Sequence, residues 1–143
     1  MKPNFTIRIY GICIKEGNLL LSQEHFSKTD MLKFPGGGLE FGEGTVECLK
    51  REMHEEFGLE VEVTKHFYTT DFFVVSAFHT DTQVISIYYL MDIISAEIPI
   101  GKIFEEEKGH QHLLWQPLDG LDSESLTFPI DKKVAKLILE EFS

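Results

Sequence analysis

Three glutamates stand close enough along the chain to act together on a metal ion. Glu52, Glu55 and Glu56 occupy positions i, i+3 and i+4. In a helix, this spacing places their carboxylates within about a third of the circumference, where like charges repel one another. A bound cation would make the same arrangement favourable. Because the candidate ligands are oxygens, with no thiolate or paired histidine among them, we expect Mg²⁺, with Mn²⁺ as the second choice.

A helix over residues 45–57 would position these glutamates. At about 100° per residue it places four apolar residues in one buried stripe. They are Val46, Leu49, Met53 and Phe57. Gly58 suits the left-handed residue that ends such a helix. Before the helix, Pro35 and the glycines 36–38 predict a turn that aims the Gly37 carbonyl at the metal and lets a phosphate approach.

The spacing of the charged residues also matches a complete motif. From Gly37, five residues precede Glu43, and seven more precede the pair Arg51 and Glu52. The apolar Met53, the glutamates 55–56, Gly58 and the apolar Leu59 complete it. This is G-x5-E-x7-R-E-U-x-E-E-x-G-U, where U is apolar. Through this stretch the chain resembles the Nudix hydrolase family.

The resemblance implies a fold, a reaction and a set of site residues. The fold is an α/β/α sandwich with a mixed β-sheet. The reaction is Mg²⁺-dependent attack of water on phosphorus in a nucleoside diphosphate linked to another moiety. The implied metal ligands are Glu52, Glu56, Glu55 and the Gly37 carbonyl. The implied catalytic residues are Glu55, Glu52 and Arg51, and the implied substrate-binding residues are Gly36, Gly37, Gly38 and Glu107.

Two assignments stay open at this point. The general base is Glu55 or one of the acidic run 105–107 in a later loop. Arg51 carries a planar, permanently charged fork, which suits it to hold Glu43 or Glu52 in place. A non-catalytic sensor of nucleotides or sugar phosphates is the alternative function. Because every glutamate of the motif is present, the sequence favours the enzyme.

Positions outside the motif narrow the substrate only partly. The proline that marks ADP-ribose hydrolases is replaced by Val74, the tyrosine of dinucleoside polyphosphate hydrolases is missing from residues 75–78, and no coenzyme A signature precedes the motif. Nucleoside triphosphates and sugar or small-molecule diphosphates, such as nucleotide sugars, remain. Phe72, Phe73 and Phe78 are candidates for a base pocket, although alternation favours core packing for at least half of them.

Composition predicts one domain over residues 1–143, since 143 residues with 43% apolar content form a single sizeable core. A net charge of −11 disfavours nucleic acid polymers and anionic membranes as partners. No apolar run is long enough to span a bilayer, so we expect a cytoplasmic protein whose partner is a small-molecule diphosphate, with edge strands that permit a homodimer. Cys13 and Cys48 are expected to be small buried or half-buried fillers without a disulfide.

The remaining pattern predicts hairpins rather than regular βαβ units. A strand over residues 4–14 turns at 15–18 into a return strand, and residues 25–33 form a loop. A long β segment over 61–78 pairs with residues 83–94. Residues 95–113 form a loop that ends in a short strand at 113–115, and Asp131 caps a final helix that runs to Glu141.

Overall fold

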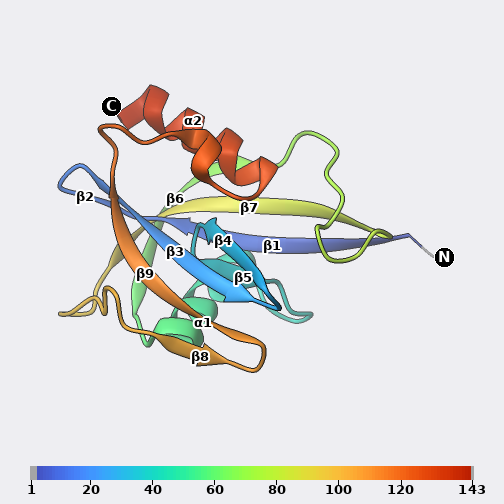
Figure 1. Ribbon diagram of the computed structural model, residues 1–143, viewed down its shortest axis with the longest axis horizontal. Helices are drawn as coiled ribbons and strands as arrows, with labels where there is room; N and C mark the ends of the chain where they lie inside the picture. Colours follow the sequence, from blue (N-terminus) through green and yellow to red (C-terminus); the bar gives the residue numbers. More distant parts are fainter. Residues whose placement is uncertain (1–2, 143) are drawn as a thin grey trace.

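The computed structural model describes residues 3–142, which form two β-sheets with one helix on each side (Figure 1). The first sheet has the strand order β5 (Gly36–Gly38), β1 (Asn4–Ile12), β7 (Thr82–Ile93) and β6 (Val61–Thr69). The second has the order β2 (Ile14–Lys15), β3 (Asn18–Phe26), β9 (Gly109–Pro117) and β8 (Phe104–Glu106), with β4 (Thr29–Lys33) paired to β3. The helices are α1 (Thr45–Phe57) and α2 (Pro129–Phe142), with a 3₁₀ turn at Ser123–Ser125.

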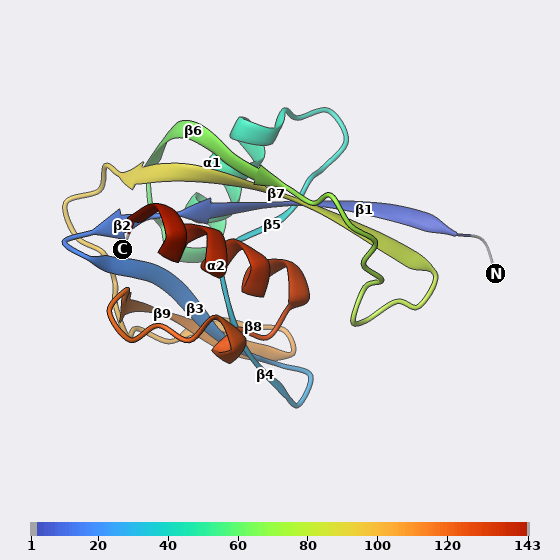
Figure 2. The same ribbon diagram turned by 90° about the horizontal axis from the view of Figure 1, so that it is seen from above.

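The first sheet is mixed, because β1 runs parallel to β7 while its other pairs are antiparallel. In the second sheet every pair of named strands is antiparallel. The expected α/β fold with a mixed sheet between helices is confirmed. Figure 2 shows α2 lying across the space between the two sheets, with α1 behind the first sheet.

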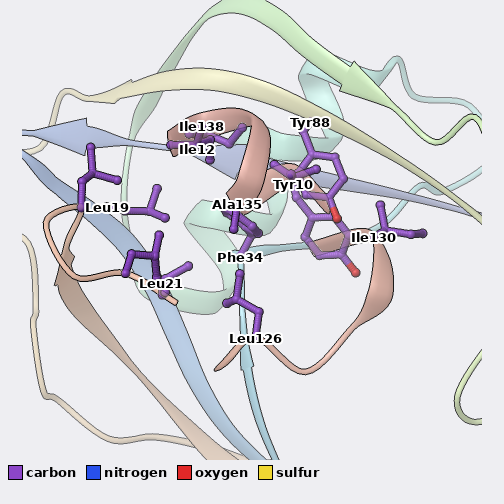
Figure 3. Packing of buried hydrophobic residues seen from close by; sticks show 13 residues of the cluster. Tyr10, Ile12, Leu19, Leu21, Phe34, Tyr88, Leu126, Ile130, Ala135 and Ile138 are labelled. Carbon is purple, nitrogen blue, oxygen red and sulfur yellow. The ribbon is translucent and has the colours of Figure 1, made fainter. Parts of the chain in front are cut away.

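Two apolar clusters hold the layers together. The cluster beneath α2 includes Tyr10, Phe34, Tyr88 and Ile138 (Figure 3). The rings of Tyr10 and Tyr88 lie 5.3 Å apart, and the ring of Phe34 meets Tyr88 edge-on at 5.5 Å. Burial of large side chains at this density is the main source of stability. The packing of this cluster therefore also fixes Tyr10 and Tyr88, which line a cavity beside α2.

The cluster beneath α1 differs from the expected stripe at one position. Leu49, Met53 and Phe57 are buried as predicted, but Val46 is 38% exposed and Cys48 is buried in its place. Val46 has the right angular position, yet it lies in the first turn, ahead of the packed part of the helix. The buried face extends around the helix toward Cys48. Viewed down the helix axis, Glu52 and Glu56 fall between Cys48 and Leu49, so they lie on the buried side.

Three expected irregular segments are regular in the structure. Residues 25–33 are not a loop: β3 continues to Phe26 and pairs with β4 through a two-residue turn at Ser27 and Lys28, both at positive φ. Residues 36–38 are a strand that pairs with β1 rather than a turn. The strand expected at 113–115 is the longer β9, which pairs with β3 along its whole length. Tertiary pairing overrides weak local propensity in all three.

Three other predictions, about a strand, three phenylalanines and a helix cap, are wrong. The segment expected to be β over 61–78 ends at Thr69, and residues 70–81 connect β6 to β7 mainly as a loop. Phe72, Phe73 and Phe78 are exposed rather than in the core. Asp131 does not cap α2, since the helix begins at Pro129 and Asp131 is 2% exposed and accepts a hydrogen bond from the Tyr88 hydroxyl.

The predicted ends of α1 and the cysteine assignments are confirmed. Gly58 adopts φ 66° and donates from its backbone N–H to the His54 carbonyl, as a left-handed helix end requires. Cys13 and Cys48 are free and buried. No helix within residues 3–142 is long and apolar enough to cross a bilayer.

Candidate active site

Arg51 holds three glutamates and the glycine strand in one arrangement. Its Nε and Nη2 donate to the two carboxylate oxygens of Glu43 at 2.9 and 2.8 Å. Its Nη1 donates to Glu52 Oε1 and Glu55 Oε2, each at 3.0 Å. Nη2 also donates to the Gly38 carbonyl at 3.1 Å. The planar fork therefore fixes α1 against β5, as the sequence suggested for Glu43 and Glu52.

Hydrogen bonds from Arg51 stabilise the ionised form of Glu43 and lower the pKa of Glu43 to about 2. Glu43 Oε1 also accepts from the backbone N–H of Glu40 at 2.9 Å. Glu43 is thus fully engaged in positioning Arg51 and the loop before α1, and it stays charged near neutral pH.

The Glu52 carboxylate lies directly against Gly37. A Cβ atom at residue 37 would stand 2.3 Å from Glu52 Oε2, well inside contact distance. Only glycine leaves room for the carboxylate at this point of β5. The structure therefore brings together two of the residues predicted for the metal site, and it gives a steric reason for the glycine.

Gln111 joins two further glutamates from different elements. Its side-chain Nε2 donates to Glu56 Oε2 on α1 and, at 2.9 Å, to Glu106 Oε1 on β8. Its Oε1 accepts from the buried Ser22 hydroxyl at 3.0 Å, which fixes the amide orientation. Gln111 is 3% exposed and was not predicted as a site residue. Its only signal in the sequence is a polar residue at an inward position of β9, in alternation with Leu113.

Glu106 has an acidic side chain that the protein alone does not satisfy. Its Oε2 is buried, and within the described part of the chain it has no hydrogen-bond donor. Burial and the adjacent Glu24 raise the pKa of Glu106 to about 8. Glu106 therefore favours its protonated form near neutral pH unless a cation lies beside it.

Glu56 shares this environment. Burial, followed by the charge of Glu52, raises the pKa of Glu56. Glu24 lies opposite Gln111 in the β3–β9 register and pairs with Lys33 at 3.5 Å. The site thus gathers the carboxylates of Glu24, Glu52, Glu56 and Glu106. Negative charge is in excess at this point of the molecule.

The remaining predicted residues are placed as follows. Glu55 has a side chain that is 58% exposed and is held by Arg51. Gly36 and Gly38 lie in β5 on either side of Gly37. Glu107 is exposed in the turn between β8 and β9, so the structure brings Glu106 rather than Glu107 to the other glutamates.

A divalent cation fits the chemistry of these residues, although their present orientation is not that of a formed site. Among residues 3–142, no three His, Cys, Asp or Glu side chains converge as metal ligands. Arg51 engages Glu52 and Glu55, while Gln111 engages Glu56. The unsatisfied Glu106 oxygen and the raised pKa of Glu56 are features that a cation would relieve. An all-oxygen donor set suits Mg²⁺ or Mn²⁺.

A cavity of about 650 Å³ has one of these glutamates, Glu24, in its wall. It lies between the two sheets and reaches the first turn of α2 and the loop over residues 74–79. Glu24 and Lys33 belong both to its wall and to the surroundings of Glu106. Its volume is in the range of small-molecule sites. Apolar side chains make up much of the remaining wall: Tyr10, Phe26, Met31, Val74, Phe78 and Ile130.

Comparisons with known proteins agree with this geometry. The NUDIX domain family model matches residues 4–138. No curated protein sequence matches the chain significantly. A MutT NUDIX hydrolase from Burkholderia pseudomallei superposes with a TM-score of 0.72 at 21% identity, covering 97% of this chain and 98% of that one. A MutT protein from Methanosarcina mazei gives 0.72 at 19% identity, covering 100% and 99%. A UDP-X diphosphatase gives 0.64 at 16% identity, covering 100% and 66%. At such identities the likeness establishes the fold.

Proposed function

Because the chain belongs to the NUDIX domain family, and is accordingly a hydrolase of pyrophosphate bonds, we propose that it cleaves a nucleoside diphosphate linked to another moiety in a Mg²⁺-dependent reaction. Nucleoside triphosphates and nucleotide sugars are the two substrate types. One observation carries the proposal: glutamates from α1 and β8 gather beside Glu24 of β3, which lines a cavity large enough for a nucleoside.

When bound, the metal ion would neutralise phosphate oxygens and hold the diphosphate for in-line attack. Glu52 and Glu56 are the proposed ligands, with Glu55 and the Gly37 carbonyl as further candidates. Glu106 joins the candidates because its buried oxygen has no donor within residues 3–142.

The protein's own side chains perform the other tasks. Arg51 keeps Glu52 and Glu55 oriented through two hydrogen bonds of 3.0 Å. Water attacks phosphorus while a carboxylate takes its proton. The bond between that phosphorus and the bridging oxygen breaks, and the electron pair leaves with the second phosphate. General-base assistance of this kind contributes roughly 10²- to 10⁴-fold.

We propose Glu106 as the general base, with Glu55 as the alternative. Glu106 Oε2 is buried and free of donors among the described residues, whereas Glu55 is exposed and bound to Arg51. With its pKa raised to about 8, Glu106 would hold a proton at neutral pH in the metal-free protein, so it acts as the base only where a bound cation keeps it ionised; the hydrogen bond from Arg51 makes the Glu55 carboxylate the weaker base.

The group attached to the diphosphate is proposed to enter the 650 Å³ cavity. Tyr10 and Phe78 provide aromatic surface there, and Asp131 and Ser86 provide polar groups. A wall of mainly apolar character with a few polar groups is typical of sites that bind a base.

The test is a Mg²⁺-dependent assay over nucleoside triphosphates, nucleotide sugars and ADP-ribose. We expect one of the first two classes to be cleaved fastest. Hydrolysis in ¹⁸O-labelled water, followed by mass spectrometry of the products, identifies the phosphorus that is attacked.

The matched variants are Glu56→Gln, within the site, and Glu62→Gln, on the exposed side of β6. We expect Glu56→Gln to lower kcat by roughly 10²-fold or more and Glu62→Gln to retain wild-type activity. Tight binding of these compounds without turnover by the wild type would instead establish a sensor.

A further inference from the structure

The mainly apolar cavity wall holds three basic side chains beside the acidic Glu24 and Asp131, even though the protein as a whole is strongly acidic. The chain carries 13 lysines and arginines and a net charge of −11. Three of these basic residues line the cavity: Arg8, Lys33 and Lys108. At long range this protein repels an anionic ligand, so the cations inside the cavity provide a local attraction that the surface does not.

Arg8 presents a guanidinium with unused donors. It lies on β1, and its Nε donates to the Tyr10 hydroxyl at 2.8 Å, with the guanidinium 5.8 Å from the centre of the Tyr10 ring. Within residues 3–142 this is the only hydrogen bond of the guanidinium, which forms no ion pair with a carboxylate there, although the charges of Glu52 and Glu24 act on it at longer range. The two terminal NH₂ groups are therefore free to receive a ligand.

The position of Arg8 connects the cavity to the glutamates. Arg8 pairs with Gly38 in the β1–β5 register, and a Cβ atom at residue 38 would lie 3.5 Å from Arg8 Nη1. Gly38 follows Gly37, whose neighbour is the Glu52 carboxylate. Adjacent strand residues point to opposite faces, so Arg8 lies across β5 from Glu52. The charges of Glu52 and Glu24 nevertheless act on Arg8, which puts its free end at the boundary between the cavity and the proposed site of hydrolysis.

Lys33 approaches the same region from the second sheet. It is 8% exposed on β4, and its Nζ lies 3.5 Å from Glu24 Oε1. Both cations act on Asp131, since Lys33 and Arg8 each oppose the rise in the pKa of Asp131 that burial causes. Arg8 and Lys33 therefore bracket one part of the cavity from opposite sheets.

We propose that Arg8 and Lys33 bind the phosphate group that joins the nucleoside in the cavity to the rest of the substrate. The inference rests on the proposed function, because it places the diphosphate at the glutamates and the nucleoside in the cavity. An arginine fork matches two oxygens of one phosphate, and a buried lysine adds a compact charge. The pair thereby selects nucleoside 5′-phosphates over compounds without a phosphate at this point.

Binding is measured in EDTA, so that the result does not depend on a metal ion or on turnover. Isothermal titration compares the 5′-monophosphates AMP, GMP, CMP and UMP with the four corresponding nucleosides. We expect Arg8→Met to weaken the best monophosphate by about 10- to 100-fold, as for the loss of hydrogen bonds to a charged group. The same change should alter nucleoside affinity by less than about threefold.

The matched control is Lys65→Met, which removes one positive charge from an exposed position of β6 outside the cavity. It should bind as the wild type does. Arg8→Lys keeps the charge but loses the fork, so we expect an intermediate loss. If circular dichroism shows that Arg8→Met does not fold, the loss of monophosphate binding in Arg8→Lys tests the proposal instead.

The contribution of Lys33 is tested without leaving Glu24 unpaired. In the double variant Lys33→Met with Glu24→Gln, the monophosphate should again weaken more than the nucleoside. Equal affinity in Arg8→Met and Lys65→Met, an equal loss for nucleoside and monophosphate, or no monophosphate binding by the wild type would each overturn the proposal.

The outcomes separate this inference from the proposed function. Turnover of a nucleotide with no effect of Arg8→Met on monophosphate binding refutes the phosphate role alone. Absence of turnover together with a selective effect of Arg8→Met refutes the proposed hydrolysis alone.

Discussion

Single side chains decide which carboxylates are available for chemistry. Arg51 engages Glu43 with two hydrogen bonds and keeps that glutamate charged, while Gln111 brings Glu56 and Glu106 together. Glu43 therefore has a positioning role, and Glu56 and Glu106 retain the capacity to bind a cation or a proton. Neutral Gln111 can hold two acidic groups only because its amide offers two hydrogens.

Asp131 provides a test of the cavity wall at the level of one residue. It is 2% exposed, bonds to the Tyr88 hydroxyl, and burial raises the pKa of Asp131 to about 6. Since this folded pKa lies above the unfolded value of 3.8, the favourable contribution of the protonated form is lost as pH rises through 6. Between pH 5 and 7, this group should lower the free energy of unfolding by about 1 kcal/mol.

The measurement is urea unfolding in EDTA at pH 5 and pH 7 for the wild type and Asp131→Asn, which keeps an acceptor for Tyr88. The wild type should lose more stability over this interval than the variant. Asp92→Asn, at an exposed position of β7, serves as the control and should follow the wild type. Parallel pH dependence of all three proteins would contradict the assignment.

At the scale of elements, the short strand β5 controls the position of Glu52. A Cβ atom at Gly37 would meet Glu52 Oε2 at 2.3 Å, whereas a Cβ atom at Gly38 has only Arg8 Nη1, at 3.5 Å, within 4 Å. We expect Gly37→Ala to displace the Glu52 carboxylate and to reduce kcat by about tenfold or more. Steady-state kinetics with the best substrate of the panel measures the effect.

Gly38→Ala is the comparison within the same strand, and it should cost clearly less kcat than Gly37→Ala. Thermal melts of both variants establish that each is folded. Equal losses in the two variants would show that the strand as a whole, rather than the Glu52 contact, determines activity.

The loop over residues 70–81 forms the other wall of the cavity. Phe78 lines the cavity and meets Phe26 edge-on at 5.9 Å, while Phe73 is 71% exposed and does not line it. We expect Phe78→Ala to raise KM by roughly tenfold with a smaller change in kcat, because aromatic surface binds the substrate and its transition state alike.

Phe73→Ala, from the same loop, should leave both constants near the wild-type values. If it raised KM as much as Phe78→Ala does, the loop would act through its flexibility rather than through the cavity wall.

At the scale of the whole molecule, the clustering of negative charge makes the free energy of unfolding depend on metal binding. Glu24, Glu52, Glu56 and Glu106 gather in a protein that already carries a net charge of −11. At a Mg²⁺ concentration about ten times the dissociation constant, binding stabilises the folded state by about 1.4 kcal/mol. The Tm should then rise by about 3–6 °C over its value in EDTA.

Calorimetry of the wild type, Glu56→Gln and Glu62→Gln measures this rise. Glu62→Gln removes the same charge from an exposed strand position and should keep the increase, while Glu56→Gln should lose most of it. An identical increase in all three proteins would place the metal elsewhere.

The sequence by itself determined the local features of the site. The spacing from Gly37 to Leu59 identified the family, the helix was predicted with the bounds that the structure has, and Gly58 ended it as expected. These succeed because helix periodicity and left-handed glycines are properties of neighbouring residues. The hairpin turn at residues 15–18 was predicted for the same reason.

Only the tertiary structure decided which distant side chains join that helix. Glu24, Glu106 and Gln111 reach the glutamates of α1 through the β3–β9 and β8–β9 pairings, and Arg8 reaches the cavity through β1. The β3–β4 pairing replaced the expected loop at 25–33 with a hairpin, and the end of β6 at Thr69 left Phe72, Phe73 and Phe78 in an exposed loop. Strand register joins residues far apart in the chain, and no local pattern encodes it.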